Sequence, residues 1–184
     1  IMFYAPVLFA APEGQEGLSA IQASAVIYWS NFMATGLGVV LLGFLGRRTL
    51  MLGGQFVCVL GMFGMFFFKT VDEVNSALLI LTVIFIIGFA VGPGPIVWLY
   101  ISEICNEQAT SVDTVVNWFW TLVVSISTPL IFAQLGGYTY LIFGCISVVG
   151  FVYIFIFMKE TKGLPQEKVK RLYHKEAKEY DLVQ

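Results

Sequence analysis

Neutral polar side chains recur at helical spacing inside the long apolar stretches of this sequence. One row consists of Ser24, Tyr28, Asn31, Thr35 and Gly38, and its steps of three and four place it on one face of a helix. The central amide, Asn31, lies near the middle of an uncharged stretch and offers both hydrogen-bond donors and acceptors. This position predicts either a hydrogen bond between helices or a contact with a neutral ligand in a central cavity.

A run of glycine and proline interrupts the apolar stretch from 74 to 102. Gly92, Pro93, Gly94 and Pro95 follow one another, and each proline removes an intrahelical hydrogen bond. We therefore expect a broken helix, which in a bilayer needs other protein or a water-lined cavity around the freed backbone groups. Broken helices of this kind indicate a transporter binding site, and a purely structural kink is the alternative.

Aromatic and amide residues lie close to these features. Trp98 follows Gly94 by one helical turn, so it either lines the same cavity or anchors the helix at the membrane surface. Asn117 begins a second polar row with Thr121, and its neighbour Trp118 lines the cavity or belongs to an aromatic belt. Amides and indoles together suit a neutral ligand rich in hydroxyl groups.

The span interiors contain no Asp, Glu, Lys, Arg or His. Ionisable groups inside a membrane mark proton relays and many catalytic sites, so the pattern argues against an enzyme embedded in the membrane and against a proton pathway in this part. The three cysteines, Cys58, Cys105 and Cys145, lack the spacing of metal ligands. We expect no cofactor, no metal and no nucleic acid partner.

These residues must be positioned by membrane-spanning helices. Of the 184 residues, 58% are hydrophobic and only 12% are charged, and the mean hydropathy is +0.84. A span needs roughly 20 apolar residues, which predicts an all-α polytopic membrane protein with six spans, the first of them truncated. The first residue is Ile, so we expect a longer protein that begins upstream. The expected spans are 1–11, 20–45, 49–68, 74–102, 114–135 and 138–158, followed by a tail over 159–184.

Basic residues predict the orientation of the spans. Arg47 and Arg48 separate the second span from the third, and seven of the ten basic residues follow Met158. Lys and Arg collect on the cytoplasmic side, so both places, including the tail, are expected there. The loop over 103–113 carries acids and no base, but acids weigh little in this rule.

Five motifs, in order along the chain, resemble the sugar-porter family of the major facilitator superfamily, which includes facilitative glucose transporters and proton–sugar symporters. The most specific is GPGPIVWLYISEI at 92–104, which is similar to the signature of the family's tenth helix. The others are IMFYAP at 1–6, GRRTL at 46–50, Asn117-Trp118 and KETKGL at 159–164. The resemblance covers nearly the whole chain and identifies it as the C-terminal six-helix bundle of such a transporter.

The resemblance implies a role for each matched residue. Asn31, Gly94, Trp98, Asn117 and Trp118 correspond to residues that bind sugar or line its cavity. Phe3 and Tyr4 correspond to an extracellular gate, and Gly92, Pro93, Gly94 and Pro95 to a hinge. The cytoplasmic charge network that holds the outward-facing state corresponds to Arg47, Arg48, Glu103 and Glu160.

Several positions depart from the family pattern. Gly43-Phe44 replaces an acid–Arg pair, the loop from Cys105 to Asp113 is short and lacks its Arg, and Lys159 replaces a proline. Ala90 stands where many glucose transporters have a glutamate that contacts sugar. These departures predict a charge network with fewer partners and leave the preferred sugar open.

The implied activity is transport of a hexose by alternating access, as uniport or proton symport, in a plasma membrane. The expected partners are a small neutral sugar, the lipid bilayer and a missing N-terminal six-helix half. A sugar sensor that does not transport, and a half-transporter that dimerises, are the alternatives on the same scaffold.

Overall fold

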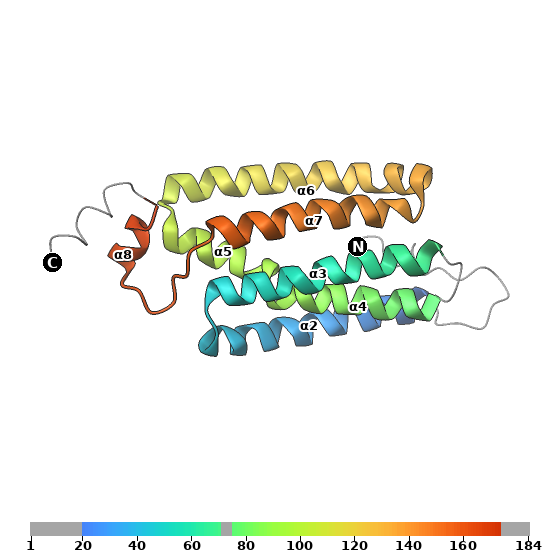
Figure 1. Ribbon diagram of the computed structural model, residues 1–184, viewed down its shortest axis with the longest axis horizontal. Helices are drawn as coiled ribbons and strands as arrows, with labels where there is room; N and C mark the ends of the chain where they lie inside the picture. The colour runs from blue at the N-terminus through green and yellow to red at the C-terminus, as the bar shows by residue number, and fades with distance from the viewer. Residues whose placement is uncertain (1–19, 71–74, 174–184) are drawn as a thin grey trace.

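The computed structural model describes residues 20–70 and 75–173 (Figure 1). All regular secondary structure in these ranges is helical, which confirms the predicted all-α class. Five helices, α4 and α5 together counting as one, are long and apolar enough to cross a membrane. The helices are α2 (Ala20–Phe44), α3 (Arg47–Thr70), α4 (Asn75–Val91), α5 (Pro93–Ile104), α6 (Glu107–Leu135), α7 (Tyr138–Phe157) and α8 (Gln166–Arg171).

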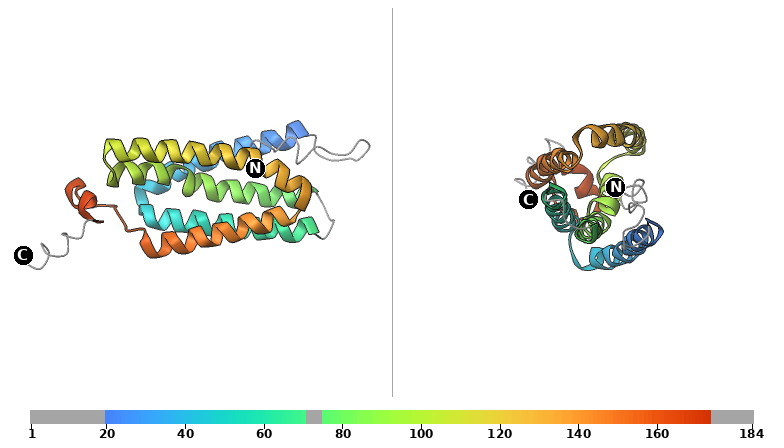
Figure 2. Two further views of the ribbon diagram at one scale, coloured as in Figure 1. Left: turned by 90° about the horizontal axis from the view of Figure 1, so that it is seen from above. Right: turned by 90° about the vertical axis from the view of Figure 1, so that its right-hand side faces the viewer.

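The long helices run side by side and α8 lies beyond one end of them (Figure 1). Seen end-on, α2 and α6 lie at opposite sides of the bundle, with α3, α4 and α7 between them (Figure 2). None of the α6 side chains is buried, whereas the shared core joins α2, α3, α4 and α7 through residues such as Ile27, Met65, Ile86 and Tyr140. In a bilayer such a core is held by van der Waals packing rather than by the exclusion of water.

The expected break in the apolar stretch from 74 to 102 lies at a single residue, Gly92. Helix α4 ends at Val91, Gly92 adopts φ −110° and ψ −95°, and Pro93 begins α5. Proline suits the first helical position because that N–H has no intrahelical partner. The Gly92 N–H still donates to the Gly88 carbonyl oxygen at 3.1 Å, so the chain changes direction with little loss of backbone bonding.

Glycine lets α3 approach this break closely. A Cβ atom on Gly54 would lie 2.5 Å from the Gly88 carbonyl oxygen and 2.7 Å from the Gly92 Cα atom. Real Cβ atoms do not come so near, so the two backbones touch only because these residues are small. The middle of α3 therefore fixes the position of the break.

Helix α6 starts earlier than the expected span over 114–135. Helix α6 begins at Glu107, well before the uncharged stretch at 114, because the Asn106 side chain accepts from the Ala109 N–H at 2.9 Å and caps the helix start. The expected first span at 1–11, including Phe3 and Tyr4, and the tail after 173 lie outside the described residues.

Candidate functional site

The polar face of α2 carries an amide that the bundle does not use. The hydroxyl groups of Ser30 and Thr35 donate to carbonyl oxygens of their own helix, at 2.7 and 2.8 Å. The partly buried Asn31 side chain forms no hydrogen bond within residues 20–70 and 75–173. The described bundle thus supplies no helix–helix bond for Asn31, and the amide is left for another partner.

Asn31 and Trp98 lie on opposite sides of the helix break. A Cβ atom on Gly38 would lie 3.1 Å from the Val91 Cα atom, so α2 reaches the level of the break at Gly38. At 1.5 Å per residue, Asn31 lies about 10 Å before that level and Trp98 about 10 Å beyond Val91. The Trp98 side chain is 40% exposed, so its indole is free to meet a ligand on the far side of the break.

The other predicted cavity residues lie on α5 and α6. A Cβ atom on Gly94 would lie 3.0 Å from the Phe89 carbonyl oxygen, so a larger residue there would crowd the turn after the break. On α6 the Asn117 amide has no hydrogen-bond partner in the part of the chain that the structure describes, and Trp118 is 62% exposed. No described hydrogen bond or ring contact joins Asn31, Trp98 and Asn117 to one another.

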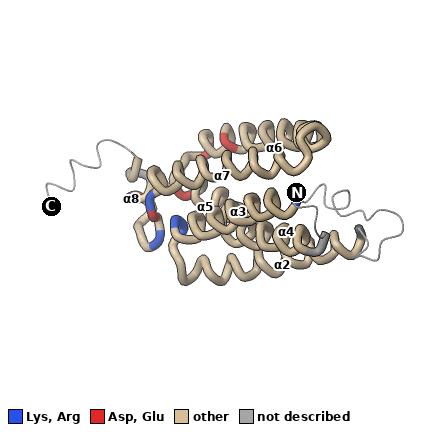
Figure 3. Tube along the Cα trace, turned by 45° about the vertical axis from the view of Figure 1, so that its right-hand side comes forward, with Lys and Arg blue, Asp and Glu red and all other residues tan. Residues whose placement is uncertain are grey.

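Charged residues gather near α8, at the end where α3 begins and α5 ends (Figure 3). We call the cluster of Arg47, Glu103, Glu160 and Thr161 the charged end. Nε and Nη2 of Arg47 donate to Oε1 of Glu103 at 3.1 and 2.8 Å. Both side chains are less than a quarter exposed, which strengthens the ion pair relative to one in open water.

The Glu160 carboxylate caps the start of α3. Its oxygens accept from the backbone N–H groups of Arg47 at 2.9 Å and Arg48 at 3.1 Å. A negative group at this position satisfies backbone donors and complements the helix dipole. A Cβ atom on Gly46 would collide with this carboxylate, so the glycine is required for the cap.

Thr161 forms hydrogen bonds to both carboxylates, a role that the sequence motifs did not predict. Its hydroxyl donates to Oε2 of Glu103 at 2.6 Å, and its N–H donates to Oε1 of Glu160 at 3.1 Å. The side chain is only 4% exposed. Its position directly after Glu160 in KETKGL is the signal that could have identified it.

Arg48 does not join this cluster through its side chain. Its Nη2 donates to the Phe155 carbonyl oxygen near the end of α7 at 2.7 Å, and the guanidinium lies 5.7 Å from the Phe155 ring centroid. Of the two arginines in the expected charge network, Arg47 is therefore the one that pairs with Glu103. Lys162 adds a link from the tail segment to the end of α2, with Nζ donating to the Gly43 carbonyl oxygen at 3.0 Å.

This arrangement of helices is also found in solved structures of XylE. The fold matches a double-Trp mutant of XylE with a TM-score of 0.85 and 23% identity, over 94% of this chain and 38% of that chain. It also matches the inward-open xylose transporter XylE from E. coli with a TM-score of 0.78 and 24% identity, over 83% of this chain and 36% of that chain. At this identity the likeness concerns the fold.

The family itself follows from the sequence comparisons. Residues 1–173 match the family described as "Sugar (and other) transporter". The chain is 35% identical over 153 residues to Trehalose transporter 1 of Drosophila melanogaster, covering 77% of this chain and 18% of that protein. It is 34% identical over 148 residues to Hexose transporter 1 of Toxoplasma gondii, covering 75% of this chain and 26% of that protein.

The chain therefore belongs to the sugar transporter family, a family of integral membrane transporters rather than of enzymes. It spans about a fifth to a quarter of the length of these two relatives.

Proposed function

We propose that this chain is the C-terminal half of a transporter that carries a neutral, glucose-like hexose across a membrane by alternating access. The observation that carries the proposal is the Asn31 amide, which lies partly buried on the polar face of α2, about two helical turns before the level of the break, without a hydrogen-bond partner in the described bundle. The amide offers both donors and acceptors, so a sugar hydroxyl can bond to it. The sugar is then recognised by neutral groups alone.

The surrounding residues support a sugar rather than a charged solute. The described membrane spans offer amides, hydroxyls and an indole, and an indole gives the apolar C–H face of a sugar a surface to stack on. The family relatives are named as trehalose and hexose transporters. The proposed contacts are Asn31 before the break, Gly94 at the break and Trp98 beyond it, with Asn117 and Trp118 on α6.

The break at Gly92 is the proposed hinge, and the charged end is the proposed cytoplasmic latch. The pair Arg47–Glu103 joins the start of α3 to the end of α5, so it holds the second half of the broken helix against α3. Opening towards the cytoplasm then requires that pair to part. On this proposal the tail is cytoplasmic, the membrane is the plasma membrane, and Phe3 and Tyr4 close the opposite side.

The decisive experiment compares two amides in the full-length protein, purified and placed in liposomes. Asn31→Ala should weaken hexose binding by about 1–3 kcal/mol because the sugar hydroxyl loses its partner. The matched control is Gln55→Ala, since Gln55 already donates to the Ser147 carbonyl oxygen at 3.1 Å between α3 and α7. That change should lower thermal stability and leave hexose affinity intact.

The outcomes separate the alternatives. Equal hexose affinity in Asn31→Ala and the parent protein would remove the proposed contact. Binding without uptake of labelled sugar indicates the sensor, and uptake of trehalose in preference to glucose replaces the hexose by a disaccharide. Uptake that follows an imposed proton gradient distinguishes symport from uniport.

A further inference from the structure

The phenol of Tyr173, just beyond α8, meets three parts of the chain at one oxygen atom. It lies 2.6 Å from the Tyr100 hydroxyl of α5, and one of the two hydroxyls donates to the other. It accepts from the Lys159 N–H at 3.1 Å and lies 3.0 Å from the Phe157 carbonyl oxygen at the end of α7. This oxygen therefore connects α5, the end of α7 and the segment that carries α8.

The same segment is held a second time through Lys159. Its Nζ donates to the Leu172 carbonyl oxygen at 2.6 Å and lies 5.1 Å from the centroid of the Tyr173 ring. Gly163 has φ 78°, a conformation that favours glycine, and lies in the turn that brings the chain back from α7. Tyr173 is 48% exposed, so it reaches the cluster from the surface rather than from the core.

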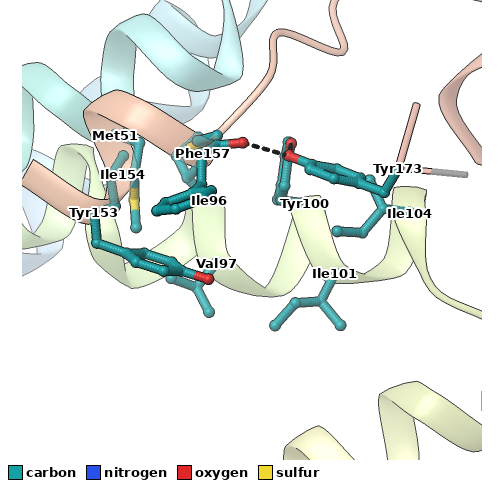
Figure 4. A pocket seen from close by; sticks show the side chains of 11 residues that line it. Met51, Ile96, Val97, Tyr100, Ile101, Ile104, Tyr153, Ile154, Phe157 and Tyr173 are labelled. Atoms are coloured by element: carbon teal, nitrogen blue, oxygen red, sulfur yellow. Dashed lines mark hydrogen bonds between the residues drawn. The ribbon is translucent and has the colours of Figure 1, made fainter. Parts of the chain in front are cut away.

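A cavity of about 320 Å³ lies along the side of α5 that faces α7 (Figure 4). Helix α5 lines it with Ile96, Val97, Tyr100, Ile101 and Ile104, a face that does not include Trp98. The cavity is partly open to the surroundings, so the α5 side chains that line it are not fully covered by protein. On this face of α5 the polar contacts converge on the Tyr100 hydroxyl, which meets the Tyr173 phenol at 2.6 Å and the backbone carbonyl oxygen and N–H of Lys159 at 2.9 and 3.2 Å.

We propose that Tyr173 is a strap that holds α5 in place and so regulates opening at the charged end. Its bond to Tyr100 fixes the α5 face that borders the cavity, while Arg47–Glu103 fixes the end of the same helix. When the strap is released, α5 can shift towards the cavity without breaking apolar packing there. The regulatory meaning rests on the proposed transport function, whereas the restraint on α5 is a property of the bundle itself.

The test uses the native thiol of Cys105, the residue that ends α5. In full-length protein with Cys105 as its sole thiol, the rate of alkylation by a membrane-impermeant maleimide reports how freely the end of α5 moves. Tyr173→Phe removes one oxygen and keeps the ring over Lys159. A hydrogen bond contributes about 0.5–1.5 kcal/mol net, so the labelling rate should rise roughly two- to tenfold.

Two further variants keep the result interpretable. Tyr100→Phe removes the shared bond and also the bonds between Tyr100 and the Lys159 backbone, so it should raise the rate at least as much as Tyr173→Phe. Adding Tyr173→Phe to Tyr100→Phe should then raise the rate by less than Tyr173→Phe does alone, because the shared bond is already lost. Tyr153→Phe is the matched control, since Tyr153 lines the same cavity but has no hydrogen bond recorded within the described ranges. Its labelling rate should equal that of the parent protein.

The proposal is overturned if Tyr173→Phe leaves the rate unchanged, if Tyr153→Phe raises it equally, or if the effects of Tyr173→Phe and Tyr100→Phe simply multiply. The labelling needs no sugar, so it is independent of the proposed function. A raised rate in a protein that neither binds nor transports sugar would leave the strap standing and remove the transport proposal. Normal sugar uptake with an unchanged labelling rate would do the reverse.

Discussion

Replacing Glu103 by Gln should shift the transporter towards its inward-facing state. The change keeps the size of the side chain and removes the charge that attracts Arg47, whose two nitrogen atoms both bond to Oε1 of Glu103. An exposed ion pair contributes about 0–1 kcal/mol, and a hydrogen bond to a charged group about 1.5–3 kcal/mol. Because the pair is roughly a quarter exposed, a value of about 1–2 kcal/mol lies between these limits.

That energy is small beside the stability of a protein but large for two states of similar energy. Since 1.36 kcal/mol corresponds to a tenfold change in an equilibrium constant, Glu103→Gln should move the ratio of the two states by about five- to thirtyfold. The Thr161 hydroxyl, at 2.6 Å from Oε2, keeps an acceptor or loses it according to how the new amide turns. Thermal stability should fall only slightly.

The assay measures access from the cytoplasm to a cysteine placed at Thr121, on the polar face of α6. In a protein without other thiols, Glu103→Gln should raise its labelling rate at low salt, where charge pairs count most, and less so at high salt. Glu107→Gln is the matched control, since Glu107 is exposed and has no recorded ion pair in the described ranges. If Glu103→Gln and Glu107→Gln label equally at low salt, the latch assignment is wrong.

Two other substitutions test the site and the cap. Tryptophan fluorescence should report hexose binding, and Trp98→Phe should abolish most of that signal; a full signal carried by Trp118 instead would place the sugar against α6. Gly46→Ala should displace the Glu160 carboxylate from the start of α3 and destabilise the protein by about 1 kcal/mol in thermal unfolding. The same change in a Glu160→Ala background should cost much less, and an equal cost there would contradict the cap.

The helices were accessible from the sequence because lipid imposes a simple rule. Each backbone group in the bilayer must be paired within its own segment, so uncharged stretches of span length predict helices where α2, α3 and α7 lie. The division between α4 and α5 was also visible, because Gly92 and Pro93 violate the helix rules together. The start of α6 at Glu107 was not, since it depends on a cap at Asn106 rather than on hydropathy.

The charged end was only partly predictable. Motif resemblance brought Arg47, Glu103 and Glu160 together, but the choice between Arg47 and Arg48 depends on which way each side chain leaves the first turn of α3. Adjacent residues of a helix point about 100° apart, so one arginine meets Glu103 and the other meets the Phe155 carbonyl. The contact between Tyr100 and Tyr173, 73 residues apart, carried no periodic signal at all.

Helix α3 links the two regions on which the proposed mechanism depends. Its first turn holds Arg47 and receives the Glu160 cap, and Gly54, about 10 Å along the same helix, touches the break at Gly92. The glycine contact leaves no space for the two backbones to slide past each other. In the proposed mechanism the second half of the broken helix turns about that contact, and the Arg47–Glu103 pair, lying at the far end of α5, restrains the turn.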